Sequence, residues 1–169
     1  MRLAVGTVVA YPPHGVGRVT ARHERVVLGV KQEVVVIELA EGLSVTLPLD
    51  RARTLLRPPA SEADLLRVGE TLREDGPLSD DVWATRLREM QEKLRGGDLL
   101  ELAQIVRDGV LRERSRSTKG AHSKLSMSER ALCAKARELL SDEIGLVRGL
   151  DQATANAWID DQLTSSAAA

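Results

Sequence analysis

The sequence predicts an α+β protein of two domains, in which a small bent β-sheet is followed by an all-α bundle of about five helices. Residues 1–57 are rich in β-branched side chains and are cut by Gly and Pro into short runs, a pattern typical of strands joined by tight turns. Residues 62–164 instead repeat apolar side chains at helical spacing. The prolines within residues 58–61 cannot continue a strand ladder and predict an extended linker. The tail, residues 165–169, contains only Ser and Ala and is expected to fray.

Strands are expected in the first domain over residues 6–11, 17–24, 32–39 and 44–48, with turns at 14–17, 28–31 and 40–42 between them. In the last strand Val45 and Leu47 alternate with polar residues, so both are expected to face the core. Short strands joined by tight turns favour a strongly bent sheet or barrel. Such a sheet can leave a strand edge free, and free edges are docking sites for other strands.

Polar residues followed three positions later by an acid indicate where several helices begin. Such pairs are Ser61 with Asp64, Asp98 with Glu101, and Ser126 with Glu129. The helix that begins after Ser61 is expected to end near Glu74. The helix that begins after Ser126 is expected to be long, with apolar residues facing inwards. The polar, cationic stretch 115–124 is expected to be a loop. A last helix over 151–163 carries Trp158, which is expected in the core or as a cap on it.

The helix expected over residues 79–94 is the most informative stretch. Ser79 or Asp80 is expected as its N-cap, with acids in the first turn. Trp83 shares an apolar stripe with Leu87, Met90 and Leu94, and it is one of only two Trp in a chain with one Tyr and no Phe. The pattern leaves two interpretations of Trp83 open. It either fills the core, or it stands at the helix tip as a wedge against a base step, flanked by phosphate-binding arginines.

Charge excludes a free-standing basic DNA-binding protein, because the net charge is -1. The distribution is nevertheless uneven. Basic residues outnumber acidic ones by eight to five in residues 1–60 and by seven to four in 115–150, whereas acids lead by thirteen to nine in 61–114. Weakly basic regions flanking an acidic one suit a nucleic-acid contact that depends on a second anchor.

The sequence carries no pattern typical of an enzyme, a metal site or a cofactor site. Gly15 and Gly17 lack the third glycine of a dinucleotide fingerprint, since Thr20 stands in its place. The three histidines, His14, His23 and His122, have neither a cysteine cluster nor helical metal spacing. We therefore expect no cofactor, no metal and no catalysis.

Other features place the chain in a reducing cytoplasm. Cys133 is the only cysteine, so an internal disulfide is impossible, and its apolar helical context indicates inert packing. No apolar run approaches ~18 residues, which argues against a membrane span. Residues 3–10 faintly mimic a signal peptide, but no cleavage site follows them and they are expected to form a strand.

The order of motifs resembles the CarD/CdnL family of bacterial transcription factors over about residues 5–145. The matching stretches are Val8–Gly17, Val82–Trp83 with Arg86 and Arg88, Glu92–Asp98, Val106–Asp108 and Leu125–Arg137. Each motif is weak alone, and their joint spacing is what is specific. The resemblance implies a Tudor-like N-terminal domain that docks on the β subunit of RNA polymerase. It also implies a helical domain that touches promoter DNA at the upstream edge of the melted bubble.

The resemblance also implies roles for individual residues. Trp83 matches a tryptophan that wedges into the minor groove, and Arg86, Arg88 and Arg130 match basic positions that contact DNA. Arg25 matches an arginine that contacts polymerase.

Three departures from the family pattern stand out. The second docking arginine falls on Thr46, so the polymerase contact is expected to depend more on strand pairing or on groups such as Arg22. The stretch 115–124 is long and has no assigned role, and Gly109 occupies a position where the family usually has an apolar residue.

These observations give three functional hypotheses. The first is a monomeric, polymerase-bound factor that stabilises open promoter complexes without reading sequence and is found at the nucleoid through polymerase. The second is a protein–protein adaptor that docks on polymerase or a repair translocase while its helices recruit another protein. The third is an autonomous sequence-specific repressor, which requires tight binding to duplex DNA alone.

Overall fold

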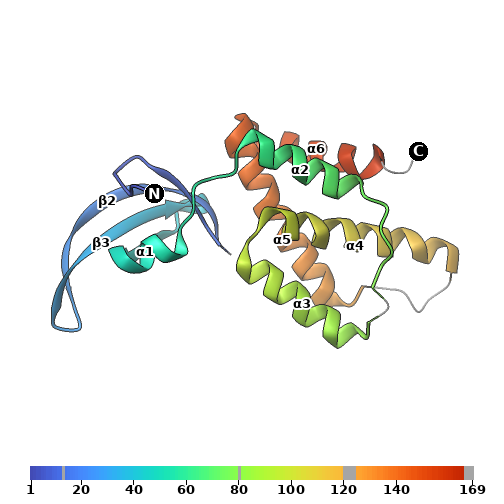
Figure 1. Cartoon of the computed structure of the whole chain (residues 1–169), viewed down its shortest axis with the longest axis horizontal. Helices are drawn as coiled ribbons and strands as arrows, with labels where there is room; N and C mark the ends of the chain where they lie inside the picture. The colour runs from blue at the N-terminus through green and yellow to red at the C-terminus, as the bar shows by residue number, and fades with distance from the viewer. Residues whose placement is uncertain (13, 80, 120–124, 166–169) are drawn as a thin grey trace. The chain divides into compact units, whose positions relative to one another are not determined.

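The computed structural model describes residues 1–12, 14–79, 81–119 and 125–165, and the chain divides into two compact units, Met1–Pro59 and Ala60–Ala169 (Figure 1). The first unit is built around a sheet and the second from helices alone. The predicted α+β class, with a small bent sheet before a helical bundle, is confirmed.

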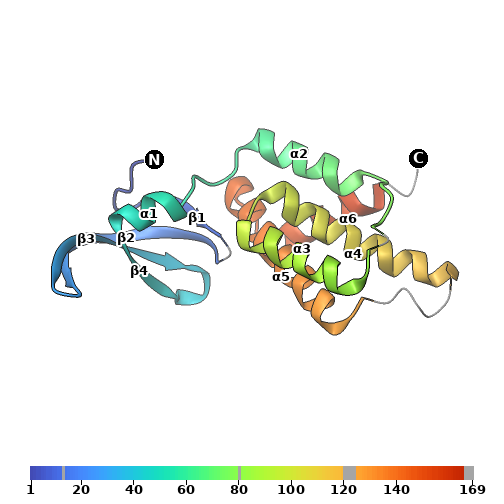
Figure 2. The same cartoon turned by 60° about the horizontal axis from the view of Figure 1, so that its bottom comes forward.

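The first unit is a curled antiparallel sheet with its strands in chain order, β1-β2-β3-β4 (Figure 2). The strands are β1 Val8–Tyr11, β2 Gly15–Val27, β3 Val30–Leu39 and β4 Ser44–Pro48, with a short 3-10 turn, η1 Ala40–Gly42, before β4. Val35, Ile37 and Leu39 of β3 point into the core at the period of a strand with one buried face, and Val34 is buried as well. As predicted, Val45 and Leu47 pack against this core while Ser44 and Thr46 are exposed.

The hairpin of β2 and β3 is longer than predicted. Gly15–Gly17 was expected to be a turn but belongs to β2, and Gly17 pairs with both Val9 and Leu39. A Cβ on Gly17 would lie 2.7 Å from the backbone oxygen of Glu38, so this glycine allows close strand approach rather than a turn. The true turn at the other end is only Leu28-Gly29, between Val27 and Val30.

A helix in the first unit was not predicted. α1 Leu49–Leu55 follows β4 directly, and its buried residues Leu49 and Ala52 cover the sheet core together with Leu56. The strand expectation for residues 1–57 is therefore wrong for this segment. Asp50 in the first turn and apolar residues three and four apart are helix signals, but they span only two turns.

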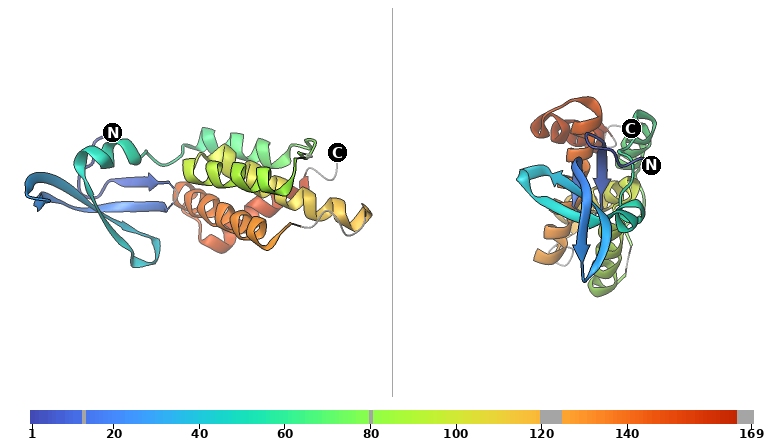
Figure 3. Two further views of the ribbon diagram at one scale, coloured as in Figure 1. Left: turned by 90° about the horizontal axis from the view of Figure 1, so that it is seen from below. Right: turned by 90° about the vertical axis from the view of Figure 1, so that its left-hand side faces the viewer.

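The second unit packs five described helices, which agrees with the predicted number. They are α2 Glu62–Arg73, α3 Trp83–Gly96, α4 Leu99–Lys119, α5 Met127–Arg148 and α6 Gln152–Ser165. α2, α4, α5 and α6 supply the buried core, and α3 rests on α4 and α5 (Figure 3). Trp158 is half-buried against this core, with the Arg148 guanidinium 4.6 Å from its ring centre, so it caps the core as one of the two expected options.

Three predicted helix starts are confirmed. Ser61 and Asp64 form a capping box at α2, and Ser126 and Glu129 form one at α5. Asp98 accepts backbone N–H groups from Leu100 and Glu101 at the start of α4.

Two boundaries differ from the predictions. α3 begins at Trp83 with Val82 as its N-cap, without a side-chain cap and without acids in the first turn. Ser79 is therefore not the cap, and Asp80 lies outside the described residues. The expected loop over 115–124 is wrong for residues 115–119, which extend α4, whereas residues 120–124 lie outside the described part of the chain.

Gly109 allows α4 and α5 to approach closely. A Cβ at this position would lie 2.7 Å from Cys133 Sγ, and the thiol lies 3.7 Å from the carbonyl oxygen of Ile105. This contact is a physical reason for a glycine where the family pattern has a larger residue.

Among the described residues, no helix combines the length and the apolarity needed to cross a lipid bilayer.

Candidate functional site

The start of α3 presents a large apolar side chain to solvent. Trp83 is the first residue of the helix and is 59% exposed, and its neighbour Val82 is also exposed. The interpretation in which Trp83 fills the core is therefore wrong. An exposed Trp on a helix end is a rare surface feature that favours a binding role.

The apolar stripe explains why the ring is exposed although its spacing is that of a core residue. Met90 and Leu94, further along the same stripe, pack against the bundle core. Trp83, the first residue of α3, does not reach this core, and Met127, the first residue of α5, is also exposed. The stripe was correctly predicted, and its first member extends beyond the packed surface.

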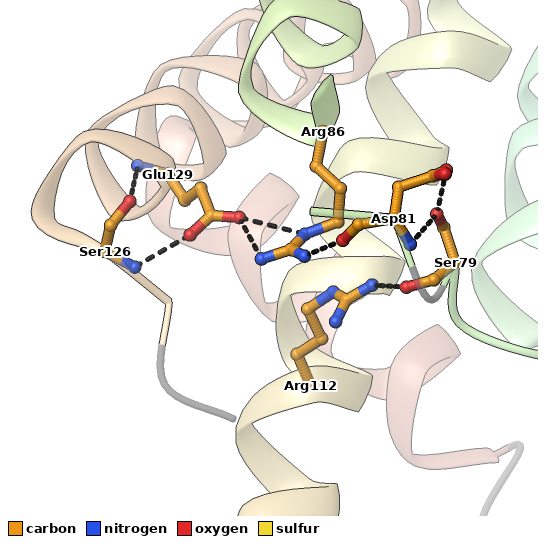
Figure 4. Close-up of polar contacts among 6 residues, drawn as sticks. All are labelled: Ser79, Asp81, Arg86, Arg112, Ser126 and Glu129. Atoms are coloured by element: carbon orange, nitrogen blue, oxygen red, sulfur yellow. Dashed lines mark hydrogen bonds and ion pairs between the residues drawn. The ribbon is translucent and has the colours of Figure 1, made fainter. Parts of the chain in front are cut away.

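Arg86, one turn after Trp83, ties α3 to α5. Its Nη2 lies 3.0 Å from Oε1 of Glu129, and its Nε donates to the same oxygen at 3.2 Å. The Arg86 side chain is 18% exposed and that of Glu129 only 1%. A further nitrogen of Arg86, Nη1, donates to the backbone carbonyl of Asp81, just before the helix (Figure 4).

The segment that enters α3 is also held from α4. Arg112 donates to the backbone carbonyl of Ser79, while the Ser79 hydroxyl contacts the Asp81 carboxylate and accepts the Asp81 N–H at 3.1 Å (Figure 4). We call this set the entry clamp. It consists of Ser79, Asp81, Arg86, Arg112, Ser126 and Glu129.

Glu129 is buried with both carboxylate oxygens satisfied. Its Oε2 accepts the Ser126 N–H at 2.8 Å, and its Oε1 faces Arg86. Burial alone would raise the pKa of this carboxyl, but the hydrogen bonds from Ser126 and the charge of Arg86 outweigh it and lower the pKa. The carboxylate is therefore ionised at neutral pH, and the guanidinium is its counter-ion.

The three basic residues expected at DNA differ in position. Arg88 is exposed and, within the described part of the chain, has no hydrogen-bond or ion-pair partner. It lies about 140° around the helix from Trp83, on the side away from the bundle. Arg130 is 53% exposed and lies 3.6 Å from Glu113, a long surface contact that leaves it accessible. Arg86 instead donates its hydrogen bonds within the protein, to Glu129 and to the Asp81 carbonyl.

The three residues expected at polymerase lie on two faces of the sheet. The register pairs Arg25 with Gln32, Ala21 with Val36, and Val36 with Thr46, which places Arg25 and Thr46 on the face opposite the core. Arg22 pairs in register with the core residue Val35 and forms an ion pair with Glu33. The extra residue at the bulge between Val19 and Ala21 decides which of the residues after it face the core.

Other chemistry is not supported by the described residues. Burial, reinforced by the carboxylates of Glu129, Glu113 and Asp108, raises the pKa of the Cys133 thiol to about 11, so the thiol is not a nucleophile at neutral pH. His, Cys, Asp and Glu side chains form no cluster of metal-ligand type in the parts of the chain that the structure describes.

Comparison with known protein families shows which family the chain belongs to. The chain matches the family model of the CarD C-terminal domain over residues 67–160 and that of the CarD-like/TRCF RID domain over residues 3–60. The chain belongs to the CarD family. A relative in Bacillus subtilis (strain 168), named "Putative transcription factor YdeB", is 24% identical over 151 residues, which cover 88% of this chain and 94% of the relative.

Membership confirms the resemblance read from the motif order. It makes this chain a CarD-like transcription factor of the kind that interacts with RNA polymerase, in a family of transcription factors rather than enzymes. The sequence had indicated the positions of Trp83 and the basic residues. It missed the clamp partners Asp81, Arg112 and Glu129, which lie up to 43 residues from Arg86 along the chain and have no shared local motif.

Proposed function

We propose that this CarD-like protein stabilises the open promoter complex. Its sheet unit docks on the β subunit of RNA polymerase, and Trp83 contacts the minor groove at the upstream edge of the melted DNA. The observation that carries the proposal is the exposed Trp83 ring at the first residue of a helix whose entry is fixed by the clamp. A helix start that is already held in place loses little conformational freedom on binding, which favours a wedge.

The mechanism is a shift of an equilibrium. Melted DNA re-anneals unless a ligand binds the open form better than the duplex. An indole beside an unstacked base step makes contacts that an intact duplex does not offer. One base–aromatic contact of ~1–3 kcal/mol shifts the open fraction roughly ten- to hundred-fold.

A second anchor makes this contact sufficient. With a net charge of -1 the chain has little affinity for DNA alone, and that affinity is expected to fall with salt. Docking on polymerase raises the local DNA concentration to about millimolar. Monomeric protein then suffices, and no base sequence is read.

The basic residues take different roles in this proposal. Arg88 and Arg130 are accessible and contact phosphates. We assign Arg86 a positioning role in place of the expected phosphate contact, because Glu129 and the Asp81 carbonyl use its donors.

The polymerase contact is proposed for the outer face of the sheet. Arg25 is exposed and has no partner within the described chain, so its charge is available. Thr46 shares that face but offers only a hydroxyl, and Arg22 is held by Glu33 on the other face. The edge of β3 before Val34, which β4 does not pair, adds backbone donors and acceptors.

Footprinting of open complexes with polymerase from the same organism tests the proposal. The wild-type protein is expected to extend protection at the upstream bubble edge, and Trp83→Ala to lose it. Leu66→Ala is the matched control, since Leu66 is another exposed apolar residue of the same unit.

Two results would contradict the proposal. If the wild-type protein binds polymerase without changing that protection, the adaptor hypothesis is favoured, in which the exposed Trp83 contacts a protein. Tight binding of the isolated protein to duplex DNA would favour the autonomous repressor.

A further inference from the structure

The tip of the β2–β3 hairpin carries an apolar residue in a conformation that such residues rarely adopt. Leu28 has a φ of 51°, in the left-handed region, and is 99% exposed. Two-residue turns of this kind favour Asn or Asp followed by Gly, and Gly29 follows here with a φ of 79°. Leu28 is thus strained and solvated at the same time, although an Asn would avoid both penalties.

Two further aliphatic side chains surround Leu28. Val26 and Val30 are 65% and 64% exposed. In the register, Val26 pairs with Lys31 and Val27 with Val30, so Val26 and Val30 point to opposite faces of the ribbon. Each face of the tip therefore carries one exposed aliphatic side chain, with Leu28 at the apex, and Lys31 lies beside Val26. We call Val26, Leu28 and Val30 the apolar prong.

The prong stands on a ribbon that no other strand of the described sheet covers. β1 pairs with β2 only as far as Arg18, and β4 pairs with β3 only from Val34 onwards. Figure 1 shows the hairpin running past the other elements of its own unit. The prong therefore contributes little to the core of the unit, and a shape of this kind fits a recess better than a flat surface.

The charges of the ribbon indicate what the rim of a complementary recess would carry. Arg22 forms an ion pair with Glu33, and Lys31 forms one with Glu24. Arg25 is left as an exposed cation without a partner in the described chain, on the same face as Val30. A complementary surface would be apolar at its centre and carry a carboxylate at its edge.

We propose that the apolar prong inserts into an apolar, acid-rimmed recess on RNA polymerase, an inference that rests on the polymerase docking proposed above. Continuity favours this partner, because Arg25, the residue expected at polymerase, lies on the same ribbon as the prong. The strain at Leu28 is kept because its side chain is the apex of this contact.

The test measures binding of the full chain to RNA polymerase from the same organism by biolayer interferometry. Leu28→Asn is expected to weaken binding roughly ten- to hundred-fold, the effect of removing one buried Leu side chain from an interface. The same variant is expected to keep or raise the melting temperature, because Asn tolerates a positive φ. Leu43→Asn, at another exposed leucine of the unit, is expected to leave binding unchanged.

The outcomes separate the prong from the function on which it rests. If Leu28→Asn binds polymerase as tightly as the wild-type protein, the proposed role of the prong is wrong. Polymerase docking by the sheet unit would still hold, most directly if Arg25→Ala weakens binding. A wild-type protein that does not bind polymerase overturns both. If Leu28→Asn alters only the sedimentation of the free protein, the prong is a contact between copies of this chain and the proposal is wrong.

Discussion

Two helices of the same bundle that follow each other in the chain, α2 and α3, are attached to it in different ways. α2 has five buried residues on one face, including Leu65, Val68 and Leu72. α3 is slightly longer, yet none of its residues is buried. It is held by half-buried Met90 and Leu94, by the Arg86–Glu129 pair and by a hydrogen bond from Lys93 to Gln104.

The starts of the two helices differ in the same sense. Ser61 closes α2 with a capping box, so that its first turn is satisfied within the chain. α3 starts at Val82 and Trp83 without a side-chain cap, and both side chains are exposed. The difference teaches that α2 is held in the bundle by buried apolar side chains. α3 is more exposed, and polar contacts fix its direction.

The largest expected effect on stability comes from breaking the entry clamp. Arg86→Met leaves the Glu129 carboxylate buried without its counter-ion and should lower the free energy of unfolding by about 3–5 kcal/mol. Urea unfolding followed by circular dichroism measures it. Arg88→Met, two residues along the same helix but exposed, should change stability by less than about 0.5 kcal/mol. Equal effects of the two variants would contradict the role of the clamp.

The next effect separates burial in α2 from display in α3. Leu65→Ala removes a fully buried side chain and should cost about 3 kcal/mol. Leu87→Ala, on α3, should cost less than about 1 kcal/mol because Leu87 is only half-buried. Comparable losses in the same urea titration would mean that α3 is held by burial after all.

The close contact between α4 and α5 at Gly109 gives a smaller effect on stability. Gly109→Ala places a methyl group 2.7 Å from Cys133 Sγ and should lower stability by about 2 kcal/mol through overpacking. Cys133→Ala in the same chain should relieve the clash. A double variant no more stable than Gly109→Ala alone would show that the strain lies elsewhere.

The pH dependence of stability probes Glu129 more finely. Its folded pKa is lowered from the usual 4.5, so the carboxylate adds stability above pH 4.5 that is lost as the pH falls through the lowered value. Glu129→Gln should therefore lose less stability than the wild-type protein when urea titrations are repeated below pH 4.5. Parallel losses in the two proteins would assign the acid sensitivity to other groups.

Local patterns predicted much of this fold. The capping boxes at Ser61 and Ser126 and the alternation of Val45 and Leu47 act within a few residues, and the structure has them where the sequence indicated. α1 was missed because two turns are too short to establish a helical period. The last residues of α4 were missed because polar, charged residues suit both a loop and a solvated helix end.

The roles of the candidate site residues stay a prediction, but the structure shows how their side chains are directed, which the sequence did not indicate. Motif order indicated Trp83 and the arginines near it. That Arg86 faces inwards and Arg88 outwards depends on Glu129, 43 residues away from Arg86, which only tertiary packing brings close. In the sheet, alternation alone puts Arg22 and Arg25, three residues apart, on opposite faces. The bulge after Val19 decides that Arg25 is the one on the face opposite the core, and the residue pattern gave no sign of it.

The smallest expected effect on stability belongs to Trp83 itself. Because the ring is mostly exposed, Trp83→Ala should change the free energy of unfolding by less than about 0.5 kcal/mol. A loss of several kcal/mol in urea unfolding would indicate that this side chain is packed in the core.

The lifetime of open promoter complexes after a competitor challenge tests the central claim most directly. The wild-type protein is predicted to lengthen this lifetime roughly ten- to hundred-fold, and Trp83→Ala to return it to the value without the protein. Leu66→Ala should keep the full effect. A Trp83→Ala variant that binds polymerase and lengthens the lifetime as much as the wild-type protein does would contradict the account.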